Sequence, residues 1–480
     1  MMLPPHASMA GRPWALVAVL AGTFMAGLDT YIVNLALPTI ARVLGVDIGL
    51  IQWVVLAYLL AITGLVVTAG RAADLWGTKP IFLTGLLTFT AGSALGALAP
   101  GIWWLIAARA VQGVGAALML AAGQAIVADL FGEGERGRAL AWLHVAASAG
   151  FAAGPTLGGV LVEHLSWRAV FVVNLPVGVG TSIAAARVLP WGGRRAGETF
   201  DIPGAVTLTA GLLALVLGLS GAPTIGWGSV EVVGLLLTAA VLLSVFMLVE
   251  LRSRQPIVDL TLFRRGPFTA GLLAAFLTFV ALAANMFLVP FLLQQLMLLP
   301  ATRAGLVMIA SPLSILWVAP LSGRLADRLG ARLPATVGLA LVMVAILLLA
   351  LAAVRSGTTP LMVAAILALY GVGTGLFQVP NNSAVLGAVP QERRGVASGT
   401  LVTMRQLGQV VGITVAGALW TSRRDQYSAV FPPHEALALG FRDAFLGLAM
   451  VAAAAAVVSW TRKPKAGRRA DGLNPQVRRP

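Results

Sequence analysis

The chain has 480 residues, of which 58% are hydrophobic and only 11% are charged. Since a soluble domain carries roughly 25% charged residues, this composition excludes a surface that faces water on all sides and predicts a protein embedded in lipid. The chain has no cysteine, and its four histidines are scattered. Disulfides, thiolate metal sites and a histidine-cluster metal site are therefore excluded.

Apolar runs long enough to cross a bilayer recur from one end of the chain to the other, each close to the ~20 residues that a membrane helix needs. In chain order they predict fourteen transmembrane helices, at 14–37, 50–69, 80–99, 102–127, 138–162, 167–187, 203–221, 230–250, 268–292, 304–321, 334–354, 360–386, 397–420 and 440–460. The first run contains an acidic residue and exceeds the core of a signal peptide, so we expect it to be retained. An even number of crossings places both termini on one side.

The net charge of +15 is distributed unevenly over the loops. Alternate loops carry most of the arginines and lysines: 71–79, 136–138, 194–195, 252–265, 324–332 and 393–394. Because basic loops stay in the cytoplasm, we expect both termini there, in a bacterial plasma membrane. The positive charge thus orients the protein and does not indicate a nucleic-acid partner. Tryptophans gather near the predicted helix ends, as interfacial aromatic residues do.

A short motif occurs twice, once as GRAADLWGTK at 70–79 and once as GRLADRLGAR at 323–332. The two copies give eight candidate residues for cytoplasmic gate loops: Gly70, Arg71, Asp74, Gly77, Gly323, Arg324, Asp327 and Arg328. Asp74 could cap a helix N-terminus or pair with a basic residue of the other copy, which would hold the inside closed. A solvated turn is the alternative.

Both copies of the motif lie on the same predicted side, so the repeat is parallel. It divides the chain into an N-terminal six-helix half (1–187), two additional helices (188–267), a C-terminal six-helix half (268–460) and a basic cytoplasmic tail (461–480). The predicted fold class is all-α integral membrane, with two parallel six-helix halves and two extra central helices.

Asp29 lies well inside the first predicted helix, in FMAGLDTYIVNLALP. A charge at membrane depth costs about 2.5–3.5 kcal/mol on insertion scales, and desolvation favours the neutral acid. A carboxyl group that can take up a proton at this depth is what proton coupling requires. The alternative is a structural acid that pairs with a neighbouring helix.

Two arginines lie well inside predicted helices, away from the ends: Arg109 in LIAARAVQGVGAALM and Arg405 in GTLVTMRQLGQ. Arginine is always charged, so each needs a partner or a water-filled cavity. Candidate partners of Arg109 are Asp29 and backbone carbonyl groups. We expect Arg109 to take part in coupling, and an interhelical clamp with no role in coupling is the alternative. Arg405 could sense substrate charge or lie nearer the interface.

The segment GFAAGPTLGG (150–159) has glycines at helical spacing, which would let another helix approach closely, and Pro155, which would bend the helix. Its candidate motif residues are Gly150, Gly154, Pro155, Gly158 and Gly159.

Polar residues in other apolar runs are candidates for a substrate cavity, although each alone is more often an interhelical hydrogen bond. Together with Arg405 they are Asn34, Gln52, Tyr58, Gln112, Asn285, Tyr370, Gln378 and Asn381. The sequence has no phosphate-binding G-x-x-x-x-G-K-[ST] loop, which argues against ATP as a partner, and no H-E-x-x-H or G-x-S-x-G motif. We therefore expect neither enzymatic activity nor a cofactor other than the coupling proton.

The quoted segments, with LDTYIVNLALPTI (28–40) and WRAVFVVNLPVG (167–178), resemble those of the fourteen-helix drug:proton antiporters of the major facilitator superfamily (EmrB/QacA-like exporters). The resemblance covers nearly the whole chain. It implies that Asp29 and Arg109 take part in proton transfer and that 150–159 is the antiporter motif. The tenth predicted helix lacks the further acids of relatives that export multiply charged cations, which argues against dicationic substrates.

The expected function is therefore proton-coupled export of amphiphilic drugs or antibiotics across the plasma membrane by alternating access, with multidrug resistance as its consequence. One alternative is a dedicated exporter of a single endogenous metabolite, lipid or siderophore. A sensor or scaffold with a transporter fold is a third hypothesis. The short non-spanning segments disfavour it, because such a protein would usually carry an added soluble domain. The sequence leaves a periplasmic adaptor undetermined.

Overall fold

The computed structural model describes residues 12–131, 133–191, 202–252, 260–390 and 393–462, so nearly all of the expected basic tail lies outside the described residues. Within these ranges the chain is helical and contains no strand. Twelve of its helical segments are long and apolar enough to cross a membrane. The all-α, multi-pass membrane fold expected from the sequence is confirmed.

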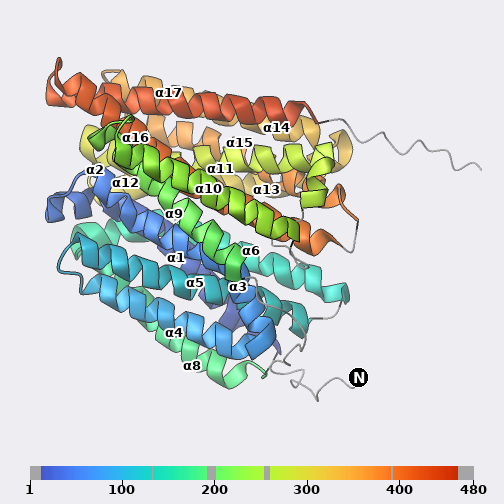
Figure 1. The fold of residues 1–480 in the computed structure, drawn as a ribbon. Helices are drawn as coiled ribbons and strands as arrows, with labels where there is room; N and C mark the ends of the chain where they lie inside the picture. The colour runs from blue at the N-terminus through green and yellow to red at the C-terminus, as the bar shows by residue number, and fades with distance from the viewer. Residues whose placement is uncertain (1–11, 132, 192–201, 253–259, 391–392, 463–480) are drawn as a thin grey trace, which may run out of the picture.

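The first half of the chain packs into one bundle, which lies in the lower part of Figure 1. Its helices are α1 (Arg12–Leu44), α2 (Ile48–Ile51), α3 (Trp53–Trp76), α4 (Thr78–Ala97), α5 (Ile102–Leu130), α6 (Glu133–His164), α7 (Ala169–Val172) and α8 (Asn174–Val188). Within this bundle α1 packs along α6, and α5 packs between α3 and α4.

The C-terminal part of the chain, from residue 260 onward, forms a second bundle, in the upper part of Figure 1. Its elements are η1 (Leu260–Arg264), α11 (Gly266–Phe291), η2 (Leu292–Leu296), α12 (Ala301–Met308), α13 (Ala310–Leu329), α14 (Arg332–Val354), α15 (Pro360–Gly387), α16 (Arg394–Ser428) and α17 (Pro433–Trp460). Here α11 packs along α16, and α15 packs between α13 and α14. The corresponding helices of the two bundles thus pack in the same way, in agreement with the sequence repeat.

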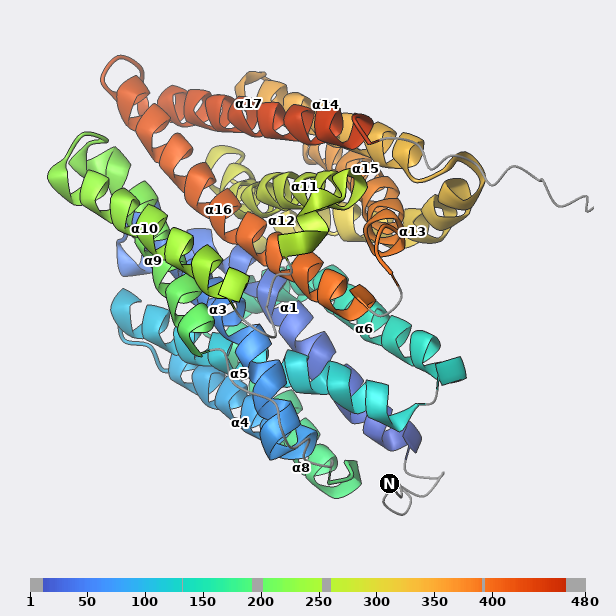
Figure 2. The same ribbon diagram turned by 45° about the vertical axis from the view of Figure 1, so that its right-hand side comes forward.

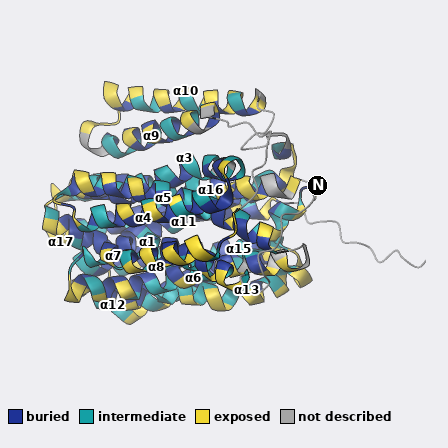
Figure 3. Cartoon of the chain, turned by 90° about the horizontal axis from the view of Figure 1, so that it is seen from below, coloured by how far each residue is buried: buried dark blue, intermediate teal, exposed yellow. Residues whose placement is uncertain are grey.

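A hairpin of α9 (Ile202–Ile225) and α10 (Val230–Arg252) lies on one side of the two bundles, as Figure 3 shows from below. One of its helices, α9, packs against both α3 of the first bundle and α16 of the second. Most of the described side chains of α10 are exposed or partly exposed, as expected for a lipid-facing helix.

All fourteen apolar runs expected to be helices are helical in the structure, but the count of fourteen membrane crossings is not confirmed. In the described residues the apolar part of α9 is shorter than a full span, Val206–Ala222, and α16 is not among the twelve segments that qualify as spans. Many helices extend beyond the predicted ranges; α1, for example, is 33 residues long.

The repeated motif forms the same turn in both bundles. Gly77 ends α3 with φ of 97°, and Gly330 ends α13 with φ of 77°. This left-handed conformation strains any residue with a side chain, so the two glycines recur for a backbone reason. These turns lie in the two copies of the repeated motif, 70–79 and 323–332, which are rich in arginine and lysine. We call the end of the molecule that carries them the basic end, and the opposite end the far end.

The two bundles contact each other closely at the far end. At Gly159 the helices α6 and α12 approach so closely that a Cβ atom on this residue would lie 2.5 Å from the Ala301 carbonyl oxygen. The exposed Glu163 carboxylate accepts a hydrogen bond from the Thr302 amide, 2.8 Å away, at the N-terminus of α12, where a negative charge is favourable. The Gln294 side chain donates to the Leu35 carbonyl oxygen at 2.8 Å.

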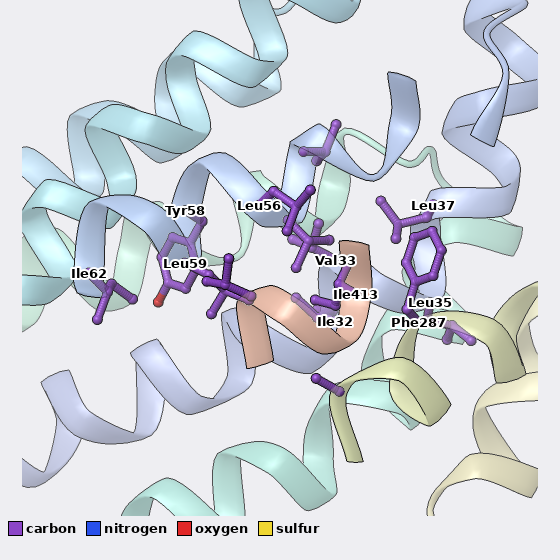
Figure 4. Packing of buried hydrophobic residues seen from close by; sticks show 14 of the residues in the cluster. Ile32, Val33, Leu35, Leu37, Leu56, Tyr58, Leu59, Ile62, Phe287 and Ile413 are labelled. Atoms are coloured by element: carbon purple, nitrogen blue, oxygen red, sulfur yellow. The ribbon is translucent and has the colours of Figure 1, made fainter. Parts of the chain in front are cut away.

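An apolar cluster reinforces this contact from the inside. Ile32 and Leu35 of α1 belong to the same buried cluster as Phe287 of α11 and Ile413 of α16, as Figure 4 shows. Hydrophobic burial between the two bundles therefore stabilises their contact at the far end.

Candidate functional site

A buried ion pair lies at the centre of the first bundle. Asp29 is in the middle of α1, and none of its surface is exposed. Its Oδ2 atom is 2.5 Å from Nη1 of Arg109 on α5. Its Oδ1 atom accepts hydrogen bonds from the side chains of Gln112, at 2.7 Å, and Asn174 of α8, at 3.0 Å. A carboxylate away from water requires such partners, because its desolvation would otherwise be uncompensated.

Arg109 has further contacts that fix its orientation. Its Nε donates to the Val54 carbonyl oxygen of α3 at 3.0 Å, and Nη1 also donates to Oε1 of Gln112 at 2.6 Å. The guanidinium carbon is 4.2 Å from the centre of the Tyr58 ring, a cation–π distance. The sequence named Asp29 as a candidate partner of Arg109, and the structure places the two together.

Sequence reasoning missed Ser93 and Asn174, which complete this arrangement. Ser93 Oγ of α4 accepts hydrogen bonds from the side chains of Gln112, at 2.8 Å, and Asn174, at 3.4 Å. Each of the two is a polar residue in an otherwise apolar run, and this sequence feature could have identified it as a candidate. We call these five residues the Asp29 network: Asp29, Ser93, Arg109, Gln112 and Asn174.

A cavity of about 360 Å³ lies between the two bundles, beside the Asp29 network. Tyr58 links the two, because its ring stacks on Arg109 and also lines the cavity. Gly27, Thr30 and Tyr31 of α1 line the cavity, whereas the fully buried Asp29 between them faces the network. The volume lies within the ~300–1,000 Å³ that is usual for small-molecule sites.

The predicted cavity residues separate into three groups. Those that line the cavity are Asn34, Tyr58, Gln378 and Arg405. Asn285 and Tyr370 line a smaller cavity of about 40 Å³, which shares Tyr31 with the larger one. The remaining three lie elsewhere. Gln112 belongs to the Asp29 network, and the side-chain amides of Gln52 and Asn381 donate hydrogen bonds to the carbonyl oxygens of Gly49 and Gly271, respectively.

Several cavity residues were not expected from the sequence. The aromatic side chains of Tyr31, Phe151 and Phe279 contribute to its walls, together with the amides of Gln406 and Gln409. Aromatic residues in apolar helices carry no sign of whether they face a cavity or lipid, which explains why these were missed.

The glycines of the predicted antiporter motif bring α6 onto two neighbours. Gly150, Gly154 and Gly158 lie against α1, where the nearest residues are Phe24, Tyr31 and Ile32 respectively. Pro155 lies inside α6, and its carbonyl oxygen contacts Gly305 of α12. The motif therefore couples the helix that carries Asp29 to the far-end contact with the second bundle.

Replacing Gly154 by leucine should destabilise the protein by about 1–3 kcal/mol, the usual cost of overpacking. A Cβ atom at this position would already lie 2.6 Å from Cβ of Tyr31. The midpoint of thermal unfolding of the purified protein measures the effect. Gly180→Leu on α8 is the matched control, since its Cβ would meet no atom of the described residues within 4 Å. Equal midpoints for the two variants would contradict this account of the motif.

The gate-loop candidates are less enclosed. Gly70 lies in α3 and Gly323 in α13, while Arg324, Asp327 and Arg328 are exposed. Asp74 is half-buried, and the side chain of Arg71 lies outside the described residues. The structure adds Lys79, whose buried ammonium group donates to the carbonyl oxygens of Ala186, at 2.8 Å, and Leu189, at 2.7 Å. This lysine thereby caps the C-terminus of α8, where a cation is favourable.

The sequence profile of the Major Facilitator Superfamily matches residues 19–413, and the chain belongs to this superfamily. Among solved structures, a bacterial homologue of the human lysosomal transporter Spinster, in an inward-facing and unoccupied conformation, aligns with a TM-score of 0.67. The alignment has 15% identity and covers 95% of this chain and 97% of that one, which shows a common fold. The protein is a membrane transporter and not an enzyme.

Two relatives have names that describe their cargo. Multidrug resistance protein Stp of Mycobacterium tuberculosis (strain CDC 1551 / Oshkosh) is 35% identical over 420 residues, which cover 87% of this chain and 77% of Stp. The tetracenomycin C resistance and export protein of Streptomyces glaucescens is 31% identical over 421 residues, which cover 87% of this chain and 78% of that protein.

Proposed function

We propose that the protein is a proton-coupled antiporter of the fourteen-helix exporter branch, which expels amphiphilic small molecules from a bacterial cell. The supporting observation is the fully buried Asp29–Arg109 pair beside a cavity between the two bundles. In this proposal α9 and α16 also cross the plasma membrane, and the basic end faces the cytoplasm, as the positive-inside rule requires.

The chemistry follows from the contacts of Asp29. While ionised, the carboxylate holds Arg109, Gln112 and Asn174 in place. Protonation removes its negative charge, so the attraction for Arg109 weakens and the guanidinium is then held by its other partners, Gln112, Val54 and Tyr58. Because Tyr58 also lines the cavity, the proton and the substrate act on one shared side chain.

The energy available is adequate for this coupling. A pH difference of one unit supplies about 1.4 kcal/mol per proton, and the membrane potential adds about 2.3 kcal/mol per charge per 100 mV. In alternating access, substrate would bind from the cytoplasm while Asp29 is ionised. Protonation of Asp29 from outside would then favour release and return.

Full-length protein in liposomes with an acidic lumen and an enclosed pH dye tests the proposal. Adding a transported dye or antibiotic outside should make protons leave the lumen while the compound accumulates. A proton ionophore should abolish the accumulation. Accumulation that persists after the gradient is dissipated would contradict proton coupling.

The second candidate is a dedicated exporter of one compound. The relative named for tetracenomycin C resistance and export favours it, whereas Stp is named for multidrug resistance. A broad panel of compounds in the same liposomes separates the two, because a dedicated exporter responds to one chemical series only.

A further inference from the structure

The cavity between the bundles carries a single formal charge among its described lining residues, and that charge is positive. It belongs to Arg405 of α16. Asp29, the nearby acid, is fully buried in the Asp29 network and neutralised there by Arg109. The ion pair contributes no net charge, so Arg405 decides the electrostatic preference of the cavity.

The guanidinium group of Arg405 is only partly satisfied. Its Nη2 donates to Oδ1 of Asn382, and its guanidinium carbon lies 5.3 Å from the centre of the Phe279 ring. Its Nε is buried and has no hydrogen-bond partner among the described residues. Arginine has five N–H donors and cannot lose its proton. Because Nε is buried, the donors that remain for a ligand in the cavity are those of Nη1 and Nη2, and their charge has no ion-pair partner among the described residues.

The rest of the wall is suited to a flat apolar body. Tyr31 and Phe151 pack with their ring centres 4.9 Å apart, and Tyr58 and Phe279 add two further rings. Aromatic faces bind planar ring systems by offset stacking or edge contacts. The amides of Gln378, Gln406 and Gln409 supply neutral hydrogen-bonding groups beside Arg405.

We propose that the cavity binds amphiphilic aromatic monoanions, with a carboxylate, phenolate or sulfonate on Arg405 and the ring system against the aromatic wall. This assignment names the substrate class of the proposed exporter and rests on the cavity being its substrate site. Cations of similar shape are disfavoured because they would meet the Arg405 charge in a site partly removed from water.

The chain offers a matched control for the arginine. Arg462, just after α17, is also buried, and its Nη2 donates to Oδ1 of Asn381, the neighbour of Asn382. Arg462 does not line the cavity. The two arginines thus share their chemistry and the type of their asparagine partner but differ in access to the ligand.

Equilibrium binding tests the proposal on full-length protein in lipid nanodiscs, with empty nanodiscs subtracted and no proton gradient. The probes are 1-pyrenecarboxylate, the neutral 1-pyrenecarboxamide and the cationic 1-pyrenemethylammonium. Wild type should bind the carboxylate at least ~10-fold more tightly than the cation. Arg405→Gln should weaken carboxylate binding by about 10–100-fold, the usual range for a charge-assisted hydrogen bond, and leave the carboxamide within about two-fold.

Arg405→Lys should retain part of the preference for the carboxylate, and Arg462→Gln should bind all three probes as wild type does. An equal loss for all three probes in Arg405→Gln would assign Arg405 a structural role and overturn the proposal. It would also be overturned by unchanged carboxylate binding in that variant, by absent carboxylate binding in wild type, or by tighter binding of the cation. Since no gradient is present, a failure of proton-driven export would leave this result untouched.

Discussion

Replacing Asp29 by asparagine should reduce proton-driven export to the level of empty liposomes while the cavity still binds substrate. Asparagine has nearly the same shape but cannot take up a proton, so the proton-binding step of the proposed mechanism is lost. The cavity wall should persist, because Asp29 faces the Asp29 network. Parallel measurements of proton release and of equilibrium binding check both halves of this expectation.

Asp443→Asn is the matched control for this substitution. Asp443 of α17 accepts hydrogen bonds from Tyr427, at 2.8 Å, and from the neighbouring Arg442, at 2.9 Å, and it lies outside the cavity lining. Its replacement should leave transport close to wild type. Proton-driven export that survives in Asp29→Asn would remove Asp29 from the coupling mechanism.

Replacing Arg109 by glutamine should destabilise the protein by about 3–5 kcal/mol, the usual cost of leaving one partner of a buried ion pair alone. Arg109 binds Asp29, Gln112 and the Val54 carbonyl oxygen at once. Lysine, with a single point charge, cannot reproduce this fork of donors, so Arg109→Lys should also melt below wild type. The midpoint of thermal unfolding measures both changes.

A double variant measures the interaction energy between Asp29 and Arg109. If the attraction between the two charges dominates, Asp29→Asn combined with Arg109→Gln should be less destabilised than the sum of the single variants. Additive losses would instead show that each side chain acts through its other contacts, such as Asn174 for Asp29 and Tyr58 for Arg109.

The sequence predicted the helices and the two buried charges for the same physical reason. An apolar run of sufficient length has few alternatives to a membrane helix, and a charge inside such a run is costly enough to signal a function. The burial of Asp29 and Arg109 was therefore predictable. The roles of Ser93 and Asn174 were not, because apolar periodicity does not report which neighbouring helix a polar side chain meets.

The pair Asn381 and Asn382 illustrates the limit. The sequence singled out Asn381 for the cavity, but its side chain contacts Gly271 and Arg462, while its neighbour Asn382 accepts from Arg405. Successive residues of an α-helix point about 100° apart, so a shift of one position exchanges the two environments. In a helix that is apolar almost all round, no pattern fixes that angle.

The α9–α10 hairpin makes the two lateral seams of the molecule unequal. One seam, between α3 and α16, is covered by α9, whereas the hairpin is absent from the opposite side, where α6 meets α12 and α13 (Figure 2 and Figure 3). The two flanks therefore present different surfaces to the bilayer: lipid meets the α9–α10 hairpin on one flank, and α6, α12 and α13 of the bundles themselves on the other.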